Sequence, residues 1–135
     1  MSGALDWRNF FAILAGGGIG SVLRYLLTLG VTQRFGPGFP WATLLINVTG
    51  SLVIGVVFEL SQTRAIGMSQ TMRLFLMTGV LGGYTTFSTF SLDLVLLFGE
   101  RAAVFALLYA AGSVVLGLAA AFGGIVMVRA LTVHP

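Results

Sequence analysis

The sequence contains no cysteine and no lysine, and charged residues of either sign are scarce. Without cysteine the chain can form neither a disulfide nor a thiolate metal site. Only 8% of the residues are charged, whereas a soluble domain usually carries about 25%. Water is therefore a poor solvent for most of the surface that this chain would expose.

Hydrophobic residues are abundant instead, at 57% of 135 residues, with a mean hydropathy of +1.01. A chain of this length cannot hide so much apolar surface in a single core, so we expect it to lie in a lipid bilayer. The seven basic residues are arginines that are scattered singly. The pI of about 10.2 therefore does not indicate a nucleic-acid-binding patch, and we expect no nucleic acid partner.

Four segments are long enough to cross a hydrocarbon core, which takes roughly 20 apolar residues. They are separated by a turn at residues 36–40, a short polar link, and a turn at Glu100-Arg101. We predict an all-α, multi-pass membrane protein with one four-helix transmembrane domain over residues 1–135, located in the cell inner membrane or plasma membrane. The predicted spans are residues 10–32, 41–60, 74–98 and 102–128.

The arginines encode the orientation only weakly. An even number of spans puts both termini on one side, with Arg8, Arg64, Arg73 and Arg129, and leaves Arg34 and Arg101 on the other. Orientation follows the asymmetry of such charges, so the sequence predicts that both orientations can be inserted.

Small residues recur four apart in every span, which predicts close helix packing. They are Ala12, Gly16 and Gly20, Ser51 and Gly55, Gly79 and Gly83, and Ser113 and Gly117.

The third span carries the most informative pattern. Two glycines, Gly82 and Gly83, are followed by five Ser or Thr residues among the next eight. This composition disfavours a continuous helix, and a break in mid-membrane frees backbone groups that can form an ion site. The alternative is an intact helix with a glycine-rich crossing point.

Two polar side chains lie deep in the first two spans, where each is costly without a partner. Arg24 is either a fixed positive charge that draws anions into a vestibule, or a residue that snorkels to the headgroups or forms a buried ion pair. Asn47 is either a ligand-binding amide or hydrogen-bonding glue between helices.

Phe87 and Phe90 lie three apart and would share a helix face. They are either ordinary core or lipid-facing residues or, because hydroxyl residues are interleaved with them, part of a mixed aromatic and hydroxyl lining.

Asp93 is the one acidic residue well inside a span. Neither a nucleophile–base pair nor a phosphate-binding loop is evident, so we do not expect an enzyme. The polar groups inside the spans are hydroxyl and amide donors and one arginine, with few carboxylates. This balance favours an anion over a cation as the transported species.

Three motifs resemble the signatures of the Fluc/CrcB fluoride channel family. They are GGGIGSVLRY at Gly16–Tyr25, TLLINVTG at Thr43–Gly50, and GGYTTFSTFS at Gly82–Ser91, the last being the most specific. The family resemblance implies passive export of cytosolic fluoride through two pores in an antiparallel, dual-topology homodimer. It also implies a structural Na⁺ at the dimer interface, held by the backbone carbonyls of Gly82 and Thr85.

The same resemblance implies a fluoride pathway with contributions from three spans. Its residues are Asn47, Phe87, Phe90, Ser88, Thr89, Tyr109, Ser113 and Thr43. This chain departs from the family pattern at Ser21, where Ala is common, at Asp93, where Glu is expected, and at Gly117, which lacks a hydroxyl.

A small four-helix multidrug or ion exporter is the alternative function, although it would need a membrane-embedded carboxylate where the first span carries Arg24. A non-transporting assembly subunit would leave the polar third span unexplained.

Overall fold

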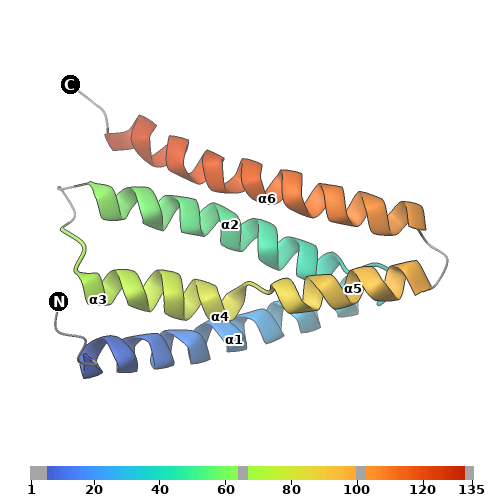
Figure 1. Cartoon of the computed structure of the whole chain (residues 1–135), viewed down its shortest axis with the longest axis horizontal. Helices are drawn as coiled ribbons and strands as arrows, with labels where there is room; N and C mark the ends of the chain where they lie inside the picture. The colour runs from blue at the N-terminus through green and yellow to red at the C-terminus, as the bar shows by residue number, and fades with distance from the viewer. Residues whose placement is uncertain (1–5, 64–66, 100–102, 133–135) are drawn as a thin grey trace.

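The computed structural model describes residues 6–63, 67–99 and 103–132. It is a bundle of four long helical segments in which the start of the first and the end of the fourth lie at the same end (Figure 1). Each segment is long and apolar enough to cross a membrane, which agrees with the predicted all-α, four-span architecture. The helices are α1 (Trp7–Phe35), α2 (Trp41–Gln62), a composite third span over Gln70–Gly99, and α6 (Ala103–Thr132).

Local signals explain where the helices begin and end. The Asp6 carboxylate accepts from the Arg8 N–H at 3.0 Å and caps the start of α1. Gly36 ends α1 with a positive φ of 76°, a conformation that glycine adopts without strain. The helices extend a few residues beyond the predicted spans at most ends. The predicted turn at Glu100-Arg101 and the first residue of the predicted fourth span lie outside the described residues.

The third span is broken, as predicted, but not at the glycine pair. It consists of α3 (Gln70–Arg73), the π-helix η1 (Leu74–Leu81), α4 (Gly82–Tyr84) and α5 (Phe87–Gly99). Gly82 and Gly83 are helical, and the chain becomes extended at Thr85, with φ −79° and ψ 159°. The break lies two residues after the glycine pair but within the predicted stretch of Gly, Ser and Thr residues. A partner on α2 takes over the backbone groups of Thr86 there.

Glycines let the helices pack in two close pairs. A Cβ atom at Gly16 would come within 3.0 Å of the Gly79 Cα, so α1 lies directly against η1. A Cβ at Gly55 would overlap the Ala121 carbonyl oxygen, and one at Gly124 would overlap the Leu52 carbonyl oxygen, so α2 lies directly against α6. Close helix packing through small residues is therefore present within the chain at the predicted Gly16, Gly55 and Gly79.

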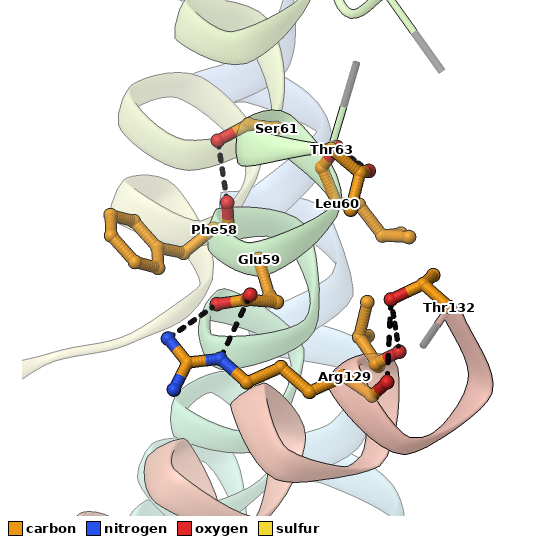
Figure 2. A network of polar contacts seen from close by, with 8 residues as sticks. Phe58, Glu59, Leu60, Ser61, Thr63, Arg129 and Thr132 are labelled. Carbon is orange, nitrogen blue, oxygen red and sulfur yellow. Dashed lines mark hydrogen bonds and ion pairs between the residues drawn. The ribbon is translucent and has the colours of Figure 1, made fainter. Parts of the chain in front are cut away.

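An ion pair joins the ends of α2 and α6 (Figure 2). The Arg129 guanidinium donates to the Glu59 carboxylate through Nε at 2.9 Å and through Nη2 at 3.2 Å. The Arg129 side chain is 60% exposed and that of Glu59 only 12%. Water screens such a pair, so its contribution to stability is small, although its two-pronged geometry is the favourable one for an arginine and a carboxylate.

The packing of α2 on α6 predicts different costs for two neighbouring substitutions. Gly124→Ala places a methyl group against the α2 backbone and should destabilise the protein by about 1–3 kcal/mol. Gly123→Ala is the matched control, because a Cβ at Gly123 meets nothing within 4 Å. Thermal melts of both variants in detergent should show a lower melting temperature for Gly124→Ala alone. Equal melting temperatures would contradict the close α2–α6 contact.

Candidate functional site at the helix break

The break between α4 and α5 is fastened to α2 by the side chain of Asn47. The Asn47 amide nitrogen donates to the Thr86 carbonyl oxygen at 3.0 Å, and the Thr86 N–H donates to Asn47 Oδ1 at 2.9 Å. One side chain thus satisfies both backbone groups of a residue that has left the helix, which hydrocarbon cannot do. Asn47 does join two spans, as the packing alternative requires. Its amide carries a second N–H that these two bonds do not use.

The break also releases backbone carbonyls from their usual donors. In a continuous helix the N–H of residue i+4 bonds to the carbonyl of residue i. The Thr86 N–H, which would bond to Gly82, donates to Asn47 instead. The Thr89 N–H, which would bond to Thr85, donates to the Thr86 hydroxyl at 3.2 Å. The carbonyls of Gly82 and Thr85 therefore both lose their helical donors.

Oxygen donors of this kind suit a hard cation, which prefers carbonyl and hydroxyl ligands. Over residues 6–63, 67–99 and 103–132, no three His, Cys, Asp or Glu side chains come together in a way that could hold a metal ion. The freed carbonyls of Gly82 and Thr85 are the oxygen donors that the break itself provides. The chemistry of this donor set fits the structural Na⁺ that the resemblance implies.

Hydroxyl groups surround the start of α5. The Thr86 hydroxyl donates to Thr89 Oγ1 at 3.0 Å and lies 3.3 Å from Ser88 Oγ, while it caps the helix by accepting from the Thr89 N–H. Thr86 itself is buried. The predicted pathway residues Ser88 and Thr89 both contact Thr86. Neither is among the residues that line the neighbouring groove.

A groove of about 320 Å³ adjoins the break and runs between α2, α5 and α6. It brings together four of the predicted pathway residues, Asn47, Phe87, Phe90 and Ser113. The Ser113 hydroxyl is shielded from solvent and has no hydrogen-bond partner among the described residues, so a donor is left free for something in the groove. The remaining lining residues are Gly50, Ser51, Ile54, Thr85, Thr86 and Val114.

The α2 wall of the groove has a signal in the sequence beyond Asn47 itself. Gly50, Ser51 and Ile54 follow Asn47 by three, four and seven residues, which is the spacing of one helix face. An amide placed on that face predicts that its helical neighbours share the same cavity. Val114 carried no comparable signal, because it is one of several apolar residues in a uniformly apolar helix.

Two phenylalanine rings form the α5 wall of the groove. The ring centroids of Phe87 and Phe90 are 5.8 Å apart, and Phe90 lies 5.2 Å from the Tyr109 ring. Phe90 therefore packs against the buried core, whereas the Phe87 side chain is 79% exposed. Ring edges carry partial positive charge, so both rings can face an anion in the groove.

Tyr109, Asp93 and Thr43 lie apart from the groove lining. Tyr109 is 1% exposed and packs with Leu97 and Ala106. Its hydroxyl donates to the Asp93 carboxylate at 3.1 Å, which gives the one deep carboxylate a partner. Thr43 is also buried. The structure thus does not bring Tyr109 and Thr43 to the groove, and their place in the pathway stays a prediction.

Arg24 is half-buried on α1 and does not line the groove. Its backbone carbonyl accepts from the Thr28 hydroxyl at 2.8 Å. A role for its guanidinium in a vestibule stays a prediction.

Comparison with known proteins gives a consistent result. The chain matches the family described as CrcB-like protein, Camphor Resistance (CrcB), over residues 11–125. It is 51% identical to the Fluoride-specific ion channel FluC of Rhizobium meliloti, over 92% of this chain and 98% of that protein. It is 47% identical to the protein of the same name from Nitrobacter winogradskyi, over 94% of this chain and 100% of that protein. The extent of these matches shows that the chain belongs to the CrcB-like family.

Proposed function

We propose that this chain is a fluoride channel that lets cytosolic fluoride leave passively across the inner or plasma membrane. The observation that carries the proposal is an uncharged groove beside the break, lined by hydrogen-bond donors and phenylalanine rings. Its relatives from Rhizobium meliloti and Nitrobacter winogradskyi are named fluoride-specific ion channels. The protein is accordingly a channel and not an enzyme.

The lining suits a small, strongly hydrated anion. Stripping water from an ion costs many kcal/mol unless other donors replace the shell. The Ser113 hydroxyl has no other partner, and Asn47 retains one amide N–H, so both can donate to fluoride. Phenylalanine edges attract the anion weakly, and conduction requires sites that bind without trapping. Neutral hydrofluoric acid crosses membranes and dissociates inside, and a passive pore lets the anion leave down its gradient.

The finer assembly that goes with this function is an antiparallel homodimer with two pores and a central Na⁺. Phe87 lines the groove while its side chain is 79% exposed, so the groove wall is incomplete in a single subunit. The small difference in arginine number between the two ends supports insertion in both orientations. The freed carbonyls of Gly82 and Thr85 would hold the Na⁺, whose role is to bind the broken helices at the dimer centre.

A small four-helix multidrug or ion exporter is less well supported. Such a protein needs a carboxylate in its transport cavity, whereas the lining of the groove has none. The Asp93 carboxylate accepts a hydrogen bond from the buried Tyr109 hydroxyl. It is therefore paired with the Tyr109 hydroxyl and does not line the groove.

Selective fluoride flux is the direct test. Purified protein in liposomes should release fluoride, as recorded with a fluoride electrode, and should release chloride at least about 100-fold more slowly, a difference of about 2.7 kcal/mol in barrier height. Protein-free liposomes give the background rate. Equal release of the two anions would overturn the proposed function.

Asn47→Asp should reduce fluoride flux by at least about tenfold, which corresponds to about 1.4 kcal/mol in the barrier. The carboxylate cannot donate to the Thr86 carbonyl or to the anion, and when ionised it repels fluoride. Ser113→Ala is the comparison, because it removes a groove donor without touching the break. We expect Ser113→Ala to lower flux at an unchanged melting temperature and Asn47→Asp to lower both. Flux at the original rate in Asn47→Asp would leave Asn47 with a packing role only.

Phe87→Ile and Phe90→Ile should each reduce fluoride efflux by about tenfold or more. An aliphatic side chain of similar size keeps the packing, usually at a cost below about 1.5 kcal/mol, but has no electropositive ring edge. The initial efflux rate is measured beside a size-exclusion profile for each variant. Undiminished flux in a well-folded variant would return that residue to an ordinary packing role.

A further inference from the structure

A second tether from α2 reaches the break on the α4 side. The Tyr84 hydroxyl lies 2.8 Å from Thr49 Oγ1. Thr49 also donates to the Leu45 carbonyl at 2.6 Å, and a threonine hydroxyl has one proton to give. The proton between the two hydroxyls therefore comes from Tyr84, and Thr49 accepts it.

The tyrosine ring reaches Thr49 across a gap that Gly50 leaves open. A Cβ atom at Gly50 would lie 3.3 Å from Tyr84 Cδ1 and 3.5 Å from Cε1, and it would overlap the Thr85 methyl group. Tyr84 and Thr85 thus occupy the space beside Gly50 together. The hydroxyl bond itself is exposed, but the tyrosine ring is packed against the buried Gly50 beneath it.

This arrangement matters because α4 is only three residues long. On one side Gly83 lies against the α1 backbone, since a Cβ there would come within 3.1 Å of the Gly17 Cα. On the other side the Tyr84 hydroxyl bond and the Asn47–Thr86 bonds hold the chain just before and just after Thr85. Contacts from α2 therefore flank Thr85, and α1 holds Gly83 from the other side.

We propose that Tyr84 is a positioning residue for the cation site: its hydroxyl, held by Thr49, fixes the turn whose Gly82 and Thr85 carbonyls would hold the ion. This inference rests on the proposed function, which includes a Na⁺ at those carbonyls. Carbonyls that are already held in place lose less freedom when the ion binds, and such preorganisation raises affinity. Tyr84 itself would not be a ligand of the ion; its role is to position the backbone that would be.

The test measures Na⁺ affinity through thermal stability and not through flux. Melting temperatures of the full-length protein in detergent are recorded over a Na⁺ series, with N-methyl-D-glucamine replacing Na⁺ at constant ionic strength. Tyr84→Phe removes one hydroxyl, and Thr49→Val removes its acceptor. We expect each to raise the Na⁺ concentration at half-maximal stabilisation about threefold to tenfold, as the loss of one hydrogen bond implies.

Three controls separate positioning from simple loss of stability. Tyr25→Phe removes the hydroxyl of a tyrosine that is 64% exposed on α1 and should leave the Na⁺ midpoint unchanged. Thr49→Ser keeps the acceptor and should restore the unmodified midpoint. In the double variant Tyr84→Phe with Thr49→Val, the shift should be no larger than in either single variant, because both remove the same bond.

The outcomes distinguish this inference from the proposed function. Tyr84→Phe with an unchanged Na⁺ midpoint, in a protein that Na⁺ does stabilise, would overturn the positioning role and leave the cation site intact. A melting temperature lowered equally at every Na⁺ concentration would likewise reduce the tether to packing. If Na⁺ failed to stabilise even the unmodified protein, the cation site and this inference would both fall, while fluoride flux would still test the channel.

Discussion

The pair of hydrogen bonds between Asn47 and Thr86 is the interaction on which the site depends. A helix that stops in the middle of a membrane exposes donors and acceptors that lipid cannot satisfy, at several kcal/mol for each group. Asn47 presents a donor and an acceptor side by side and so pairs with both backbone groups of Thr86. The break can therefore persist without water at that point. The groove, the α5 N-terminus and the freed carbonyls all exist because the chain leaves the helix there.

Close packing is what brings Asn47 within reach of the break. Gly50 lies one helical turn beyond Asn47, and the absence of its side chain leaves room for the Thr85 methyl group. On the other face of α2, Gly55 admits the backbone of α6, which brings Ser113 to the same groove. Dispersion forces and hydrogen bonds, and not the hydrophobic effect, hold helices together in lipid. Small residues thus serve the site by setting distances between backbones.

The sequence was sufficient for the architecture and for most of the groove. Apolar run length predicted four spans, and the glycine and hydroxyl content of residues 82–91 predicted a break. The sequence could not give the exact position of the break. Helix propensity favours the glycines as the weakest point of the helix, whereas the residue that stabilises the break, Asn47, is 39 residues away from Thr86. The sequence also does not predict the π-helix η1 or the burial of Tyr109 against Asp93. Both result from tertiary packing and leave no local pattern.

The break has a consequence for how the chain enters the membrane. The third span has the lowest mean hydropathy of the four candidate spans, and its interrupted backbone makes it a poor transmembrane segment by itself. Synthesis runs from the N-terminus, so α2 and its Asn47 are made before the third span. Asn47 can then pair with Thr86 as that span moves sideways into lipid. The order of the segments along the chain thus makes Asn47 available before Thr86 needs a partner. Membrane insertion of the third span and formation of the site are coupled in this way.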